Sequence, residues 1–316
     1  MAYLRALGCY VPERVVDNAE IGALTGAEPA WIAQATGIER RRFAAAGQTV
    51  ADLGVRAAQD CLSAAGVDAR HVGLVMVASG SGERRFPGPA TAIATALGAD
   101  GVPAIDLPMA SAGALFGLAL ANSLCRDYGD VLVIGAEIMS RVVRMDPAGR
   151  DTAILFGDGA GAALVSTKTG FAEIVDSILM SDGALADALR LELDGPLHMD
   201  GRTIILHASR KMPRAITELL ERHALKPEDI GAYLLHQANL NLIERVARAV
   251  GAPLDRFFHN LEEYGNTSSA SLLIAATEWR RAAGPREIDE HVVLAAFGAG
   301  LNWGAMLLGP VRPADR

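Results

Sequence analysis

The chain has 316 residues, of which 51% are hydrophobic and 21% are charged, and its formal net charge is −8. This is the composition of an ordinary globular protein, long enough for a large buried core or for two fused units. A chain this acidic is not expected to bind nucleic acid, although an acidic carrier protein could dock on a local basic patch.

The three cysteines and the N-terminal segment indicate in which cellular compartment the protein is expected. Cys9, Cys61 and Cys125 form no CxxC pair and show no metal-ligand spacing, so we expect a reducing, cytoplasmic setting and no metal site. The N-terminal segment has no charged stretch followed by a long apolar run, which predicts no signal peptide. Apolar runs of about 18 residues are also missing, so no membrane span or membrane partner is expected.

Apolar runs of strand length alternate with amphipathic runs of helix length. The expected strands are Val72–Ala78, Pro103–Leu107, Val131–Gly135, Ala162–Val165, Ala232–Leu235 and Val292–Phe297. The expected helices are Val50–Ala65, Ser111–Tyr128, Ala208–His223, Leu240–Val250 and Ser269–Ala282. Strands separated by helices predict an α/β fold with mostly parallel sheets.

A weak internal repeat divides the chain in two. Val67–Ser79 and Leu225–Gln237 both run from a short polar link through an Ile/Val-Gly pair into an apolar strand, 158 residues apart. The same offset takes Ser111 to Ser269, and each opens a helical pattern. The repeat predicts two similar α/β halves packed on each other, residues 1–167 and 168–316.

Ser111 follows a strand and opens a Gly- and Ala-rich helix. A hydroxyl there lies near the positive end of the helix and near unpaired backbone N–H groups, which can stabilise an oxyanion. The alternative is a serine that only caps the helix, and this segment alone favours the cap.

Two further polar positions are expected at junctions between elements. His236 ends a strand just before a helix, which suits a site at the sheet edge, although a structural histidine bonded to a loop carbonyl is the alternative. Asn266 lies in the turn Tyr264-Gly265-Asn266 before a Ser/Thr run, where plain turn chemistry is the alternative. A nucleophile, a histidine and an amide at corresponding junctions together predict an active site.

Four motifs carry a family resemblance that runs nearly end to end. They are His236–Asn239 (HQAN), Tyr264–Ser271 (YGNTSSAS), Phe156–Leu164 (FGDGAGAAL) and Phe297–Gly304 (FGAGLNWG). In combination they resemble the signatures of β-ketoacyl-acyl carrier protein synthase III. The resemblance implies a thiolase fold with an αβαβα layering, a homodimer, and an enzyme that acts on acyl-coenzyme A and acyl carrier protein. Coenzyme A thioester would be a substrate, and no separate cofactor is implied.

The resemblance also assigns roles. The family's Cys-His-Asn site would fall on Ser111, His236 and Asn266, with serine in place of cysteine. Its oxyanion hole would be the backbone N–H groups of Ser111 and Ala299. Trp31 and Arg150 match residues that bind the nucleotide of coenzyme A, and Phe86 matches a residue that reaches into the partner's acyl pocket.

The sequence departs from the family pattern at Ser111 and near the substrate entrance. A serine does not ionise as a thiolate does beside a helix N-terminus, so it needs a general base, for which His236 is the candidate. Ala35 and Asn241 stand where arginines are usual, which would weaken phosphate or carrier binding. Because several neighbouring positions differ too, natural divergence is favoured over an engineered Cys→Ser exchange.

Three functions follow from these features. The first is an acyltransferase that carries an acyl group on Ser111, as in starter-unit enzymes of polyketide or fatty-acid biosynthesis. The second is decarboxylative condensation with malonyl-carrier protein, with Ser111 tolerated or engineered. The third is a non-catalytic partner subunit, against which the presence of both His236 and Asn266 argues.

Overall fold

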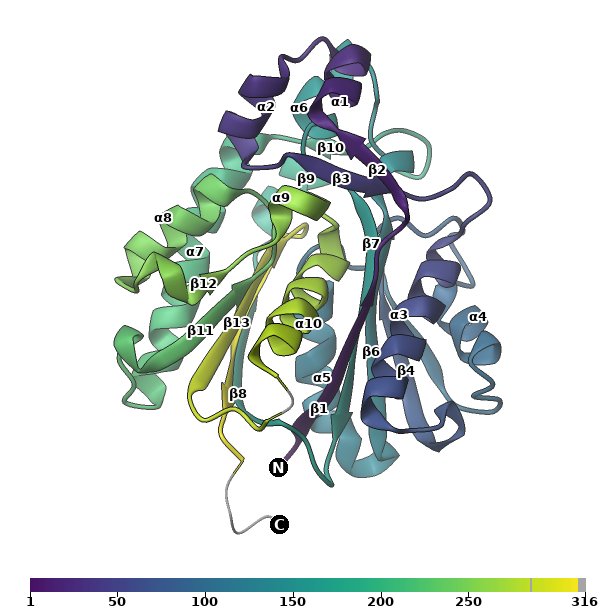
Figure 1. Cartoon of the computed structure of the whole chain (residues 1–316), viewed down its shortest axis with the longest axis vertical. Helices are drawn as coiled ribbons and strands as arrows, with labels where there is room; N and C mark the ends of the chain where they lie inside the picture. The colour runs from purple at the N-terminus through teal and green to yellow at the C-terminus, as the bar shows by residue number, and fades with distance from the viewer. Residues whose placement is uncertain (285, 312–316) are drawn as a thin grey trace.

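The computed structural model describes residues 1–284 and 286–311. Five layers stack in the order helices, sheet, helices, sheet, helices, which is the layering that the sequence predicted. Figure 1 shows the strands running roughly along the long axis, with a smaller group of short helices and strands at one end.

The first half of the chain builds five strands in the order β5-β4-β6-β7-β1. Strand β4 is parallel to β5 and β6, whereas β7 is antiparallel to both β6 and β1. The bounds are β1 Tyr3–Tyr10, β4 Val72–Ala78, β5 Ala104–Leu107, β6 Asp130–Ile138 and β7 Asp158–Ser166.

The second half repeats this pattern strand for strand, in the order β12-β11-β13-β14-β8. Strand β11 is parallel to β12 and β13, and β14 is antiparallel to β13 and β8. The bounds are β8 Ala172–Ser181, β11 Ile230–Leu235, β12 Phe257–Phe258, β13 His291–Gly298 and β14 Asn302–Gly309. The two first parallel strands, β4 and β11, begin at Val72 and Ile230, which is the offset of the sequence repeat.

The two five-stranded sheets join where β1 meets β8. Only two residue pairs make the junction, Tyr3 with Glu173 and Leu4 with Ala172, so the ten strands form one continuous sheet that folds over a central layer. The chain passes from β7 to β8 through residues 167–171, where the sequence predicted the boundary between halves. Because the central core draws on strands of both halves, the division into units 1–167 and 168–316 stays a prediction.

The helices supply the other layers. Those of the first half are α1 Asn18–Thr25, α2 Pro29–Thr36, α3 Val50–Ala65, α4 Pro89–Ala96, α5 Gly113–Tyr128 and α6 Arg150–Ala153; those of the second are α7 Gly201–Arg222, α8 Leu240–Val250, α9 Leu261–Tyr264 and α10 Ser271–Ala283. Helices α5 and α10 form the buried central layer, α3 and α4 cover one outer face, and α7 and α8 cover the other.

Local chemistry explains where the helices end. Thr49 and Asp52 form a reciprocal capping box at the start of α3, and Gly66 ends that helix in a left-handed conformation. Asn239 caps α8 by accepting from the N–H of Asn241. The periodicity therefore placed α3 and α8 at their observed bounds, because each has a strong cap and a terminal glycine.

Two short ribbons lie outside the main sheet. Strands β2 (Arg14–Asp17) and β3 (Arg40–Phe43) pair beside α1, α2 and α6 at the end of the molecule that Figure 1 shows at the top. Strands β9 (Leu189–Arg190) and β10 (His198–Met199) pair within the segment that follows β8. None of the described helices is long and apolar enough to cross a membrane.

Candidate active site

Ser111 lies in a sharp turn between β5 and α5. Its backbone φ is +54°, in the left-handed region that few residues other than glycine adopt, and its side chain is buried. Such strain persists only where the surrounding structure fixes it, and it is characteristic of functional turns from strand to helix. The turn thus places the hydroxyl two residues before the first turn of a buried helix.

The capping role considered for Ser111 is wrong. Helix α5 begins at Gly113 rather than at Ser111, its N-cap residue is Ala112, and no side chain caps it. The left-handed backbone of Ser111 takes its hydroxyl out of the capping position, since a capping residue needs an extended backbone. The side chain is therefore not used to hold the helix.

His236 directly follows β11 and is buried. Its backbone N–H donates to the carbonyl of Ala295, and its Nδ1 lies 2.6 Å from Oγ of Ser271. Burial lowers the pKa of His236 to about 4, and an interaction with the backbone of Ser268 offsets this only in part. The imidazole is therefore neutral at physiological pH, with one ring nitrogen held by a hydroxyl instead of a loop carbonyl.

Asn266 is also buried, and it lies in a turn as expected. It follows the short helix α9, and its backbone forms a single parallel bridge with Phe156. Its side-chain Oδ1 accepts from the N–H of Ser268 at 2.8 Å, so the expected turn chemistry is present. This bond fixes the plane of the amide and leaves Nδ2 as the group that can donate elsewhere.

One short segment, Asn266–Ser271, connects the three predicted catalytic residues. The hydroxyl of Ser268 accepts from the backbone N–H of Ser111 at 3.0 Å, and the hydroxyl of Ser271 contacts His236. Ser268 itself has a φ of +50°. From the sequence, the serines of this segment were expected only to cap a helix; their burial in the TSSAS run was not foreseen, although five small residues in a row were its visible sign.

The β13–β14 turn lies against Ser111 on another side. A Cβ added to Gly298 would lie 2.8 Å from Cβ of Ser111 and 2.9 Å from the N atom of Ala112, so only glycine fits. The next residue, Ala299, accepts from Nδ2 of Asn302 through its carbonyl at 2.6 Å. The turn that carries Ala299 is thus beside Ser111, whereas the N–H of Ser111 already donates to Ser268. The oxyanion hole stays a prediction.

The residues predicted to bind coenzyme A come together although they are far apart in sequence. Trp31 lies on α2 with 40% of its surface exposed, and the guanidinium carbon of Arg150, at the start of α6, lies 5.2 Å from the centre of its ring. A cation and an aromatic face at this distance attract each other. The pair presents a flat surface of the kind on which a purine can stack.

The two departures near the predicted entrance also touch. The side-chain amide of Asn241 donates to the carbonyl of Ala35 at 2.9 Å, and Asn239 donates to the same carbonyl at 3.0 Å. A groove beside them is lined by Arg245 and Arg248 of α8. Asparagine therefore ties α2 to α8 at a place where the family resemblance had implied two cations.

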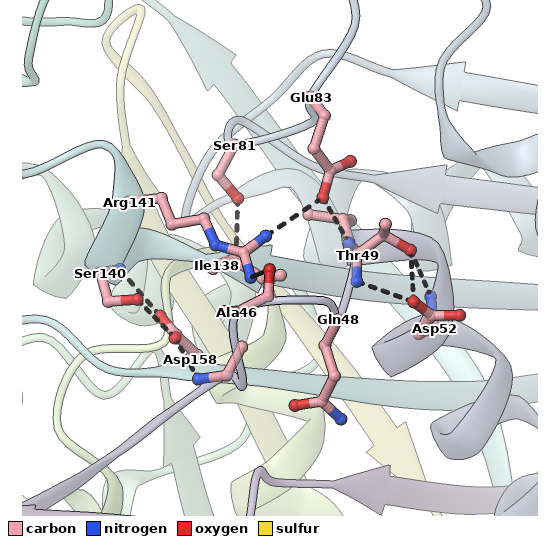
Figure 2. Close-up of polar contacts among 12 residues, drawn as sticks. Ala46, Gln48, Thr49, Asp52, Ser81, Glu83, Ile138, Ser140, Arg141 and Asp158 are labelled. Carbon is pink, nitrogen blue, oxygen red and sulfur yellow. Dashed lines mark hydrogen bonds and ion pairs between the residues drawn. The ribbon is translucent and has the colours of Figure 1, made fainter.

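Phe86 is separate from this cluster. It lies on the loop after β4 with 85% of its surface exposed, so it lines no acyl pocket within one chain. Figure 2 shows how the start of that loop is held: the Ser81 hydroxyl accepts from the N–H of Ile138, and Glu83 faces Arg141. Glu83 also accepts from the N–H of Val50.

Comparison with known proteins places this chain in a family. Two family models match, "3-Oxoacyl-[acyl-carrier-protein (ACP)] synthase III" over residues 105–183 and its C-terminal counterpart over residues 220–309. A β-ketoacyl-[acyl-carrier-protein] synthase III of Oleidesulfovibrio alaskensis is 38% identical, covering 97% of this chain and 98% of the relative. The chain belongs to the β-ketoacyl-[acyl-carrier-protein] synthase III family.

Solved structures agree with this assignment. The β-ketoacyl synthase III of Aquifex aeolicus superposes with a TM-score of 0.93 at 32% identity, covering 98% of this chain and all of that one. The priming β-ketosynthase of the R1128 polyketide pathway superposes with a TM-score of 0.91 at 32% identity, covering 99% and 97%. The thiolase fold of this synthase III is therefore confirmed, and the chain is a transferase of the acyl-condensing type.

Proposed function

We propose that this synthase III carries an acyl group on Ser111, in place of the cysteine of its family, and takes it from coenzyme A or an acyl carrier protein. The observation that carries the proposal is the left-handed turn at Ser111, which leaves the hydroxyl free of capping, while the Ser111 backbone N–H bonds to the segment Asn266–Ser271 that also contacts a buried histidine and contains a buried amide. A serine kept only for structure would need neither the strain nor these neighbours.

In the acylation step a thioester is exchanged for an oxygen ester. Oγ of Ser111 attacks the thioester carbonyl, its proton passes to His236, the carbon–sulfur bond breaks, and the thiol leaves with a proton. The oxygen that becomes negative in the transition state would be stabilised by the backbone N–H groups of Ser111 and Ala299. An acceptor then takes the acyl group and restores the serine.

The low pKa of His236 favours a second function for the same site, decarboxylative condensation. A histidine with a pKa of about 4 is a weak base, which slows attack by serine, but it is reliably neutral. A neutral imidazole and the Asn266 amide can both donate hydrogen bonds to the carbonyl of a malonyl thioester as it loses carbon dioxide. The retained pair therefore supports condensation as well as transfer.

Intact-mass measurement tests the role of Ser111. The protein is incubated with a panel of acyl-coenzyme A donors, and an adduct of the acyl mass is expected in wild type and not in Ser111→Ala. Ser63→Ala, at an exposed position on α3, is the matched control and should acylate as wild type does. No adduct with any donor would refute the transferase, and a β-ketoacyl product on adding malonyl-carrier protein would identify condensation.

A homodimer is part of the proposal. Strand β5 is one of the two edge strands of the sheet, Ile105 within it is 43% exposed, and Phe86 is 85% exposed, which are the features of a surface that a second copy covers. A partner seated there would receive Phe86 in its acyl pocket. Light scattering is expected to give twice the chain mass of 33.1 kDa, and a monomer mass would contradict the dimer.

A further inference from the structure

Glu137 is a fully buried carboxylate that follows the apolar run Val131–Ala136 of strand β6. It is the penultimate residue of β6, all of whose residues are buried, and burial raises its pKa. Placing a carboxylate in such a position is costly unless hydrogen bonds compensate it. No part of the acyl-transfer chemistry uses Glu137, so its surroundings need an explanation of their own.

One side of the Glu137 carboxylate holds the loop after β4. The N–H groups of Gly80 and Ser81 donate to it at 3.0 and 2.9 Å, and the Ser81 hydroxyl donates at 2.5 Å. The hydroxyl of Ser79 lies 3.2 Å away. This is the loop that continues to the exposed Phe86.

The other side of the same carboxylate faces the segment Asn266–Ser271. The N–H of Ser269 donates to it at 3.4 Å, and the hydroxyls of Ser268 and Ser269 each lower the pKa of Glu137. Ser269 is fixed further by its hydroxyl, which donates to the carbonyl of Ala78 at 2.9 Å. One side chain thus joins the end of β4 to the turn that precedes α10.

The backbone of that turn is strained at Ser268. Ser268 has a φ of +50°, which is unfavourable for a residue with a side chain and persists only where neighbours enforce it. The same residue accepts from the N–H of Ser111 and donates its own N–H to Asn266. A change in the backbone at Ser268 would therefore move the surroundings of Ser111 and of Asn266 together.

We propose that Glu137 is a positioning residue for the acyl-transfer site, because its carboxylate bridges the loop Ser79–Ser81 and the segment Asn266–Ser271 and so fixes the turn around Ser111. This inference rests on the proposed function of Ser111. The bridge also links the catalytic turn to the loop that carries Phe86, which gives the partner-facing surface a direct connection to the site.

The test replaces Glu137 with glutamine, which keeps the shape but loses the charge. One oxygen becomes an NH₂ group, which cannot accept, so the amide loses either the oxygen that accepts from the N–H of Ser81 or the one that accepts from the N–H of Ser269. The matched control is Asp158→Asn. Asp158 is equally buried, and its pKa is also raised by burial. Its carboxylate accepts from the N–H of Ala44 and from Ser140, the latter shown in Figure 2, and among the residues that the structure describes it has no hydrogen bond to Asn266–Ser271.

Hydrogen exchange measures how well the backbone of the turn is protected, without depending on activity. Peptides covering residues 266–271 and 109–113 are expected to exchange faster in Glu137→Gln than in wild type and to be unchanged in Asp158→Asn. Equal exchange in wild type and a folded Glu137→Gln would overturn the inference, and so would equal acceleration in both variants. Should Glu137→Gln fail to fold, Glu137→Asp keeps the charge but is shorter, and it must show the same acceleration.

Acylation kinetics complete the test. At saturating donor we expect Glu137→Gln to acylate Ser111 at least about tenfold more slowly, with KM changed by less than about twofold, because the substrate site is intact while the reacting groups are misplaced. Asp158→Asn should keep its rate within about twofold of wild type. An unchanged rate in Glu137→Gln would overturn the inference, whereas a wild type that forms no adduct would refute only the role of Ser111.

Discussion

The backbone N–H of Ser111 donates to the hydroxyl of Ser268 across 3.0 Å, in a buried part of the site. That N–H is the one predicted to stabilise the oxyanion, so a substrate carbonyl must take the place of Ser268 as its acceptor. The free enzyme thus keeps a donor satisfied that would otherwise be buried and unpaired.

Ser268→Ala tests this exchange of acceptors. Leaving the Ser111 N–H unpaired should lower the free energy of unfolding by about 1–3 kcal/mol. An acyl group on Ser111 brings a carbonyl that can accept from the same N–H, so acylation should raise the melting temperature more in Ser268→Ala than in wild type. Calorimetry of the free and acylated forms measures both shifts, and equal shifts would show that Ser111 N–H does not face the acyl oxygen.

The burial of His236 predicts how the reaction depends on pH. Its pKa in the folded protein is about 4, so the neutral, active form persists well below the ordinary value near 6.5. The acylation rate should therefore stay level from about pH 8 down to about pH 5.5 and fall as pH approaches 4. Intact-mass measurements on samples quenched at fixed times give the acylation rate across this pH range. An inflection near pH 6.5 would contradict the neutral, buried state of His236.

The same shift affects stability in a defined direction. In the unfolded chain His236 protonates near pH 6.5, whereas the folded protein keeps it neutral. The unfolded state therefore binds more protons between these values, and the stability contributed by the neutral imidazole is present above pH 6.5 and lost as pH falls towards 4. The free energies of unfolding of wild type and His236→Gln, measured with denaturant, should differ least at the acidic end of this window.

Much of the fold could be predicted because local signals and the repeat agree. The bounds of α3, α8 and β4 follow from capping residues, terminal glycines and an uninterrupted apolar run. The doubled topology follows from the 158-residue offset between β4 and β11. The joining of β1 to β8 could not be predicted, since two residue pairs between distant strands leave no pattern in the sequence.

The site was predicted only in part, for a physical reason. Ser111, His236 and Asn266 occupy junctions that a sequence pattern marks, and the structure brings all three to the segment Asn266–Ser271. The backbone of Ser268 and the carboxylate of Glu137 are set by tertiary contacts that no spacing encodes. For Glu137, the visible sign was a carboxylate directly after the apolar run of β6.

Ser111→Cys is expected to convert slow transfer into faster condensation. A thiol ionises far more readily than a hydroxyl beside the start of a helix, so it depends less on the weak base His236. The resulting thioester is also a better donor to a carbon nucleophile than an oxygen ester. Formation of β-ketoacyl product from acyl-coenzyme A and malonyl-carrier protein should rise at least about tenfold. No gain would show that the site, beyond the nucleophile, no longer supports condensation.

Trp31→Ala tests whether the nucleotide of acyl-coenzyme A contributes to binding of the donor. Trp31 is exposed and stacks with Arg150, so the substitution should leave the fold intact and remove the surface on which the purine of coenzyme A would lie. We expect KM for acyl-coenzyme A to rise by about tenfold, which is the loss of roughly 1.4 kcal/mol of binding. The KM for acyl-pantetheine, which lacks the nucleotide, should not change. Tyr128→Ala removes a similarly exposed aromatic at the far end of α5 and should leave both values unchanged. An equal rise for both donors in Trp31→Ala would mean that α2 shapes the pantetheine channel and not a nucleotide site.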